Sequence, residues 1–409
     1  MPKDEALWSL VDQGAVSVGN FLTAVILART LSATQFGAFS LLFLALFSIN
    51  TLHQSLVIYP LTLAVAQDSE AGGRQSTGRA IAHTGILWLP WLLILSAVLL
   101  ALHRLDVMAG MTVAMLAWQL QEVARRALLA SARARAAILP DVISYIGQAA
   151  ILIALRPHTL NQVFLCIAAT SAAALAWQLV VCRPAFTGIF HPEHTAQAWR
   201  LGKYSLAANI LTMAMLQFPG WLLRSLGGLA VVGAYQALAN LMGIANPIIF
   251  SMSNMLIPSI ARASRTGPQQ ARRVMVRYGL RFGYLLLPCF LILALFPHIV
   301  MTLAYGSHSP YLGLAPLLRI IAFTFAVQYF ATIVGAYEGG MSRPRSYMYS
   351  QVAGLILLIT LGSLLMRLYG VTGAAYAGLI AASARLVTFV SLSRSADLAL
   401  ERQTVAAAS

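Results

Sequence analysis

Long apolar stretches recur along the whole chain and constrain its fold more than any other feature. A helix that crosses a membrane needs about 20 mostly apolar residues. Windows of that kind are found at 7–30, 37–66, 80–102, 107–130, 137–155, 160–182, 204–224, 229–257, 278–304, 311–338, 347–366 and 371–392. In lipid the backbone must satisfy its hydrogen bonds within each segment, which favours helices. The sequence therefore predicts an all-α polytopic membrane protein with twelve transmembrane helices.

Composition excludes the main soluble classes. Hydrophobic residues make up 59% of the chain and charged residues only 10%, whereas soluble domains carry about 25% charged residues. The net charge of +15 would suggest a nucleic-acid partner for a soluble protein. In a membrane protein, basic residues instead mark the cytoplasmic loops. We therefore expect membrane lipids as partners and no nucleic acid.

The basic residues alternate with the predicted loops. If the N-terminus is cytoplasmic, 20 of the 27 lysines and arginines fall on the cytoplasmic side and five on the opposite side. Arg319 and Arg385 are the two that remain inside predicted spans. A wrong helix count would scramble this alternation from the error onward. The pattern predicts that both termini are cytoplasmic.

The two halves of the chain share marks at matching helices. An arginine ends the first helix of each half, a glycine opens the second helix, and a proline follows further along it: Arg29, Gly37 and Pro60 in one half, and Arg224, Gly233 and Pro258 in the other. Both copies begin on the same side of the membrane, which is typical of parallel repeats. We predict two six-helix lobes, residues 1–190 and 191–409.

The first two helices carry a family resemblance. Residues 14–42 read GAVSVGNFLTAVILARTLSATQFGAFSLL, with a polar-flecked first helix, an Ala-Arg-Thr-Leu turn and a Phe-Gly pair before the second helix. This segment resembles the opening of the polysaccharide transporters, the lipid-linked oligosaccharide flippases of the multidrug/oligosaccharidyl-lipid/polysaccharide exporter superfamily. The resemblance implies two lobes, a central cavity and alternating access.

The same resemblance implies a biological setting. The substrate would be a glycan on an isoprenoid pyrophosphate, in lipopolysaccharide or exopolysaccharide biosynthesis at the bacterial inner membrane. Glycan polymerase or assembly proteins would be partners. One departure concerns the relatives that move the peptidoglycan precursor, some of which carry charges midway along the first helix. Here residues 18–23 read VGNFLT, without a charge, which puts that precursor in doubt.

Polar residues inside the spans are the candidate site residues, because burying them in lipid is costly. Asp12, Gly19, Thr23 and Thr30 fall on one narrow face of the first helix. Such a face either lines a cavity or forms a helix-packing seam, and both alternatives stay open. Asp12 is a candidate ion-coupling residue and Thr23 a candidate substrate contact.

The seventh helix carries a second polar face. Asn209, Gln217 and Arg224 lie within about 80° of each other around Pro219. We expect a proline-kinked helix whose polar side chains contact substrate, the alternative being an ordinary kink. Arg29, at the end of the first helix, is a further candidate, although it also has the position to snorkel to the outer interface.

Arg319 is the leading candidate for binding the substrate's pyrophosphate, because a guanidinium inside a span can bind pyrophosphate with two parallel hydrogen bonds. Glu338, near the end of the same span, is a second ion-coupling candidate, with an interfacial cap as its alternative. Glu122 precedes Arg125 and Arg126 by three and four residues, a spacing that predicts a structural ion pair.

Motifs for catalysis are missing from the sequence. It has no GxxxxGK[ST], no HExxH and no GxSxG. We expect no enzyme activity, no metal and no bound cofactor, with transport coupled to sodium, protons or the membrane potential. A flippase of lipid-linked glycans is the first hypothesis. A cation-coupled multidrug extruder is the second, and a membrane glycan polymerase or ligase the third, disfavoured by the short external loops.

Overall fold

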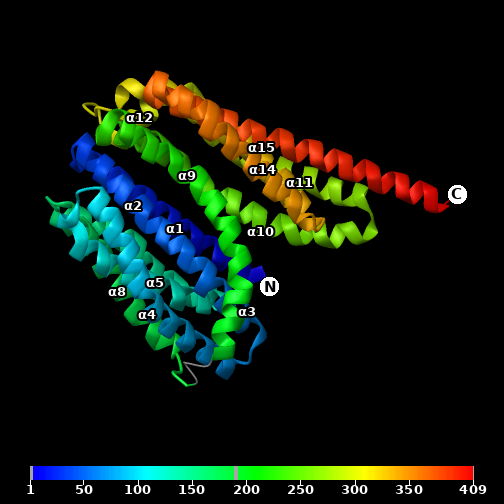
Figure 1. The fold of residues 1–409 in the computed structure, drawn as a ribbon, viewed down its shortest axis with the longest axis horizontal. Helices are drawn as coiled ribbons and strands as arrows, with labels where there is room; N and C mark the ends of the chain where they lie inside the picture. The colour runs from blue at the N-terminus through cyan, green and yellow to red at the C-terminus, as the bar shows by residue number, and fades with distance from the viewer. Residues whose placement is uncertain (1–2, 188–191, 409) are drawn as a thin grey trace. The chain divides into compact units, whose positions relative to one another are not determined.

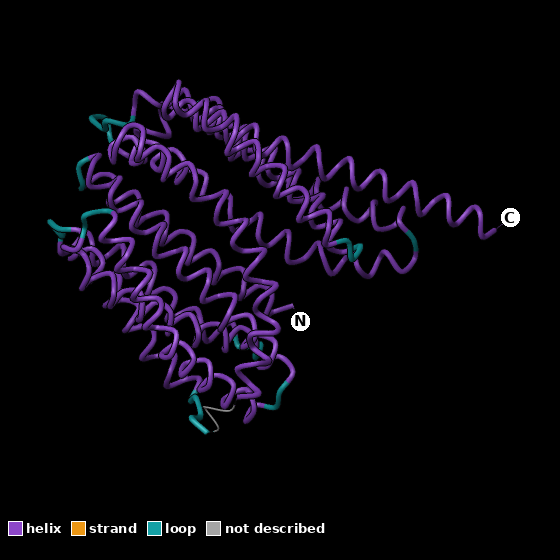
Figure 2. Tube along the Cα trace, in the orientation of Figure 1, coloured by secondary structure: helices purple, strands orange, loops and turns teal. Residues whose placement is uncertain are grey.

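The computed structural model describes residues 3–187 and 192–408. Helices joined by short loops make up this part of the chain, which contains no β-strand (Figure 2). It divides into two compact units, Met1–Met213 and Ala214–Ser409. The lobe boundary predicted at 190/191 lies outside the described residues.

Unit 1 holds the blue to green helices of Figure 1. They are α1 (Lys3–Thr30), α2 (Ala33–His53), α3 (Tyr59–Gln67), α4 (Glu70–Ala101), α5 (Met108–Ala130), α6 (Ala134–Asp141), α7 (Gly147–Leu155), α8 (Leu160–Cys182) and the beginning of α9 (Pro192–Leu241). Two π-helical turns, η1 (Gln54–Ile58) and η3 (Val142–Ile146), join α2 to α3 and α6 to α7.

Unit 2 holds the rest of α9 and the green to red helices. They are α10 (Asn246–Ala263), α11 (Pro268–Leu295), α12 (Pro297–Tyr305), α13 (Ala315–Gly340), α14 (Pro344–Leu357) and α15 (Ser363–Ala408). A third π-helical turn, η7 (Leu358–Gly362), joins α14 to α15. Five of these helices carry proline in the first turn, where its missing N–H costs no hydrogen bond: α10, α11, α12, α13 and α14.

Helix length and hydropathy agree with the predicted spans. Within the described residues, nine helical segments are long and apolar enough to cross a membrane. Two of them are broken by glycine, at Gly228 (φ 79°, ψ −172°) and Gly370 (φ 56°, ψ −125°). The sequence predicts loops at these same two places. Dividing these two segments at their glycines gives eleven helices. The twelfth is α5, whose charged residues lower its mean hydropathy.

The break in α15 reverses the chain. A Cβ on Gly373 would lie 1.9 Å from the carbonyl oxygen of Leu365. In a continuous helix these residues would be about 12 Å apart along the axis. Residues 363–369 and 371–397 therefore pack side by side as a helical hairpin.

Sequence-local signals set the helix ends. Ser32 begins α2 with a capping box, accepting from the Gln35 N–H while the Gln35 side chain accepts from the Ser32 N–H. Thr159 and Gln162 repeat the arrangement at α8. These caps satisfy orphan backbone donors and fix where the short loops stop.

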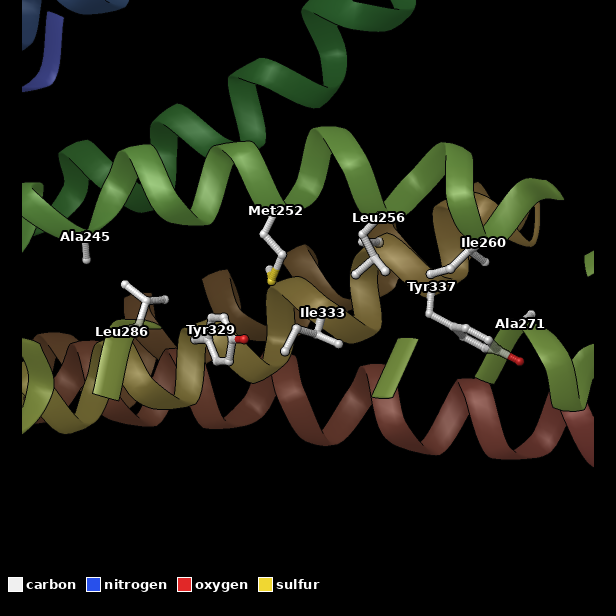
Figure 3. Packing of buried hydrophobic residues seen from close by; sticks show 10 residues of the cluster. Ala245, Met252, Leu256, Ile260, Ala271, Leu286, Tyr329, Ile333 and Tyr337 are labelled. Carbon is white, nitrogen blue, oxygen red and sulfur yellow. The ribbon is translucent and has the colours of Figure 1, made fainter. Parts of the chain in front are cut away.

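Each unit has its own apolar core. In unit 1, α5 packs along α8, and α1 packs on α6, η3 and α7. In unit 2, buried residues of α10, α11 and α13 interdigitate, with Met252 and Leu256 facing Tyr329, Ile333 and Tyr337 (Figure 3). The all-α fold of a multi-pass membrane protein follows from these two helical units.

Candidate functional site

A buried arginine at the centre of unit 1 binds three carboxylates. Arg125 of α5 contacts Asp12 of α1 at 2.5 Å and Glu122 of α5 at 3.4 Å, and its Nε donates to Asp141 of α6. The four side chains are at most 5% exposed. The predicted pairing of Glu122 with the following arginines is confirmed, and it extends to two further helices.

Neighbouring polar groups complete this ion network. Arg126 Nε lies 2.6 Å from Glu122 Oε1, and its side chain is 38% exposed. The Gln54 amide donates to the same oxygen at 3.1 Å. Gln121 donates to Asp141 Oδ1 at 3.4 Å. We call Asp12, Glu122, Arg125, Arg126 and Asp141, with these amides, the ion network.

Irregular helix turns place two members of the ion network. Gln54 opens the π-helical turn η1, and Asp141 lies immediately before the π-helical turn η3. A π-turn contains one extra residue, which rotates the following side chains relative to a regular helix, and such turns are frequent at functional sites. Here Gln54, in η1, bonds Glu122, and Asp141, beside η3, bonds Arg125.

The charges in the ion network do not balance. Three ionised carboxylates face two guanidinium groups, which leaves one negative charge in a low-dielectric setting. The second carboxylate oxygen of Asp12 is buried and has no hydrogen-bond partner among the described residues. The arrangement can therefore take up one proton or one small cation with a gain in electrostatic free energy.

Unit 2 has a smaller cluster at the turn between α13 and α14. Arg343 Nη1 contacts Glu338 at 3.3 Å and Asp397 of α15 at 2.9 Å. The Tyr337 hydroxyl donates to Asp397 at 3.0 Å. Glu338 is fully buried in the last turn of α13 and shares Arg343 with Asp397, and its role in ion coupling stays a prediction.

Arg385, in the second half of α15, differs from these paired arginines. Its Nε is buried without a hydrogen-bond partner, and no carboxylate in the described part of the chain lies within ion-pair distance. Gly354 makes room for it, since a Cβ there would lie 2.7 Å from Arg385 Cγ. Every buried carboxylate in the described chain binds an arginine, whereas the half-buried Arg385 binds no carboxylate.

The polar face predicted on the first helix is a packing seam over most of its length. Asp12 binds Arg125, Gly19 lies against the backbone of Tyr145, and Thr23 accepts a hydrogen bond from Gln148 at 3.1 Å. Of the two alternatives left open by the sequence, these contacts favour helix packing. Thr30 instead bonds back to the Ile26 carbonyl and is exposed.

The residues predicted on the seventh helix are divided between the units. Asn209 belongs to unit 1 and donates to Ser55 at 2.9 Å. Gln217 is buried and Arg224 half-buried, both in unit 2. Arg29 lies exposed in the last turn of α1. The structure does not gather these residues into one cluster within either unit, and their substrate contacts stay predictions.

Arg319 lies near the beginning of α13 with an exposed side chain. Counted from Ala315, it is about 6 Å into the helix, which is shallower than the sequence suggests. Its Nε donates to the carbonyl of Ala294, one of the last four residues of α11, at 3.0 Å. Arg319 therefore caps a helix C-terminus, and its phosphate contact stays a prediction.

Two members of the buried clusters, Asp141 and Asp397, cannot be identified from helical spacing. Asp141 and Asp397 lie far along the chain from the arginines they bind, so no helical spacing connects them. Asp141 lies inside the predicted span 137–155, and an acid there is costly in lipid unless it has a partner. Its position alone therefore indicates a buried partner. Asp397 follows the last predicted span, and an acid outside a span does not require a buried partner.

Comparisons with known proteins support the fold. No protein-family model matches the chain, and no curated protein matches it by sequence. An inward-facing multidrug resistance transporter of the MATE family aligns at 14% identity over 97% of this chain and 96% of its own, with a TM-score of 0.70. The lipid II flippase MurJ, in an inward closed conformation, aligns at 11% identity over 94% of this chain and 86% of its own, with a TM-score of 0.76.

A third similar structure is a MOP superfamily transporter from Pyrococcus furiosus, described as having a binding pocket of reverse polarity. It aligns at 12% identity over 97% of this chain and 95% of its own, with a TM-score of 0.65. All three are transporters. At these identities the likeness establishes the fold alone, a twelve-helix fold in two lobes that the chain shares with these transporters.

Proposed function

We propose that the chain is a flippase that moves an anionic, isoprenoid-pyrophosphate-linked glycan precursor across the bacterial inner membrane by alternating access. The observation that carries the proposal is the distribution of charge inside the helices. Asp12, Glu122 and Asp141 are all paired with Arg125, so together they leave at most one negative charge for a cationic drug. Arg385 has a buried Nε without a hydrogen-bond partner, and no carboxylate of the described chain lies within ion-pair distance of it.

Arg385 has the chemistry that a pyrophosphate requires. A guanidinium stays charged, so its burial creates a demand for an anionic partner. Phosphate oxygens accept two parallel hydrogen bonds from its planar fork. A multidrug extruder for cations would gain nothing from such a group. The resemblance of residues 14–42 to polysaccharide transporters and the fold shared with a lipid flippase support the same substrate class.

For energy coupling we propose a proton shared between Asp12 and Asp141 at Arg125. These two carboxylates contact the same guanidinium, and one proton removes the excess negative charge of the ion network. Glu338, the other ion-coupling candidate, shares Arg343 with Asp397, so its cluster is the alternative place for the coupling ion. Transport in vesicles with an imposed pH gradient, a sodium gradient or a membrane potential separates the three expected forms of coupling.

Flipping in reconstituted vesicles tests the substrate. The probe is a short fluorescent glycan on an isoprenoid pyrophosphate, and the comparison probe is the cationic dye ethidium. We expect protein-dependent movement of the first and not of the second. Movement of ethidium alone would overturn the flippase and favour the extruder.

Variants of Arg385 test the site. Losing a hydrogen bond to a charged group costs about 1.5–3 kcal/mol, which corresponds to about 10- to 100-fold in affinity. Arg385→Gln is expected to weaken probe binding by that factor, and Arg385→Lys by less. Arg367→Gln, which changes an exposed arginine of the same hairpin, is the matched control. Unchanged binding by well-folded Arg385→Gln would remove the pyrophosphate role.

A further inference from the structure

The turns that end α5 and α13 have the same backbone conformation. Ala132 and Ser342 are both left-handed, with φ of 55° and 59°. The next N–H bonds back in the same way in each, from Arg133 to the Leu128 carbonyl and from Arg343 to the Glu338 carbonyl, both at 2.9 Å. Arg133 and Arg343 therefore occupy equivalent positions in the two six-helix repeats.

The two arginines differ in their partners. Arg343 binds Glu338 and Asp397. In the first repeat the position of Glu338 is taken by Leu128, and no carboxylate of the described chain lies within ion-pair distance of Arg133. In the second repeat, side chains of the protein thus supply anionic oxygens to Arg343. In the first repeat, the equivalent Arg133 has no such partner among the described residues.

The first repeat has a cavity at this place. A volume of about 660 Å³ lies where the α3–α4 loop, the α5–α6 turn and the end of α8 meet. Its lining includes Arg74, Arg133 and Arg183 together with Asp68 and Glu70. The Nε of Arg74 donates to the Arg183 carbonyl at 2.7 Å, which ties α4 to the end of α8 and holds two of the arginines near each other.

The lining charges match one kind of ligand. Three guanidinium groups suit the oxygens of a phosphate, and the beginning of α4, where Ser69 is the N-cap, adds a partial positive charge. Asp68 and Glu70 would repel a second anionic group but attract an ammonium group. A headgroup that joins a phosphate to a primary amine satisfies both sets. The positive-inside pattern assigns this end of the unit to the cytoplasmic leaflet.

We propose that the cavity lined by Arg74, Arg133 and Arg183 binds a phosphoethanolamine headgroup, and that this group takes the place that Glu338 and Asp397 hold in the second repeat. The source is a phosphatidylethanolamine molecule of the inner leaflet or free phosphoethanolamine. This site belongs to unit 1 alone and does not depend on which substrate the protein transports.

Lipid retention tests the proposal. The full chain is delipidated in detergent, incubated with phosphatidylethanolamine, phosphatidylcholine or phosphatidylglycerol, and examined by native mass spectrometry. We expect tightest retention of phosphatidylethanolamine, because the choline ammonium cannot donate hydrogen bonds and the glycerol headgroup has no amine. Equal retention of the three lipids would overturn the proposal. Competition by free phosphoethanolamine indicates that the headgroup suffices, and its failure assigns the site to the lipid.

Substitutions locate the site. Arg133→Gln and Arg183→Gln, both at exposed positions, should each lower phosphatidylethanolamine affinity about 10-fold. Arg273→Gln, at an exposed arginine of α11 outside the cavity, is the matched control. Leu128→Glu copies the second repeat into the first and should displace the lipid by supplying an internal carboxylate. Retention unchanged by Arg133→Gln and by folded Leu128→Glu would show that the cavity does not hold the headgroup.

Discussion

Arg125 and Asp12 are 113 residues apart in the sequence and 2.5 Å apart in the structure, and both side chains are buried. Their contact joins α5 to α1, and the bond from Arg125 to Asp141 adds α6. Removing charged groups from water is costly, and the cost is repaid only where geometry is good and every partner is present. The ion network therefore stabilises one particular arrangement of these helices.

Arg125→Gln is expected to destabilise unit 1 strongly. It would leave three buried carboxylates without their shared cation, and breaking a buried pair in this way costs about 3–5 kcal/mol. Thermal unfolding of the purified protein in detergent measures the loss. Arg126→Gln is the comparison and should cost less, because the Arg126 side chain is 38% exposed and Glu122 keeps its contact with Arg125.

Neutralising the carboxylates should reverse part of that loss. In the triple variant Arg125→Gln, Asp12→Asn, Asp141→Asn, two stranded charges are gone, so its unfolding temperature should exceed that of Arg125→Gln alone. Equal unfolding temperatures for wild type and Arg125→Gln would show that the ion network does not stabilise the helix arrangement.

The sequence predicts most of the helices and only part of the ion network, for a physical reason. Apolar length and glycine or arginine at the turns are local signals, so both the breaks near Gly228 and Gly370 and the spans around them are predictable. The Glu122–Arg125 contact follows from helical spacing. The partners Asp12 and Asp141 depend on which helices pack together, and no local spacing marks the π-helical turn beside Asp141, which reads VISYI.

Gly373→Ala is expected to abolish folding of the α15 hairpin. A methyl group at this position would lie 1.9 Å from the Leu365 oxygen and 2.3 Å from its carbonyl carbon. Both are backbone atoms that cannot rotate away, and overpacking costs about 1–3 kcal/mol even where side chains can adjust. Gly378→Ala is the control, because its nearest neighbour would be a Thr324 methyl group at 3.7 Å.

Membrane-inserted yield and monodispersity in detergent report the outcome for these two glycines. We expect little or no folded Gly373→Ala and normal yield of Gly378→Ala. Folded Gly373→Ala in wild-type amounts would contradict the close approach of the two halves of α15.

Both termini and the loop after α10 are predicted to be cytoplasmic, from the 20:5 division of basic residues. Ser264→Cys and Ser309→Cys, placed singly in a chain whose three native cysteines are replaced, report the two sides. An impermeant thiol reagent added to right-side-out vesicles should label Cys at position 309 and label position 264 only after permeabilisation. The reverse pattern would invert the topology.

Arg319 is expected to act mainly as a cap on α11. Its Nε donates to the Ala294 carbonyl at 3.0 Å, and its side chain is exposed, so a substitution strands no buried charge. Arg319→Gln should cost about 1 kcal/mol of stability, the net value of an ordinary hydrogen bond, and leave glycan export within about twofold of wild type. Thermal unfolding and export in a complementation assay measure the two effects together.

Arg319→Lys, which keeps the positive charge but not the planar guanidinium, should lose the same stability and the same small amount of export. A tenfold fall in export for Arg319→Gln at unchanged stability, partly restored in Arg319→Lys, would instead establish the phosphate contact predicted from the sequence, because only a role in substrate binding depends on the positive charge.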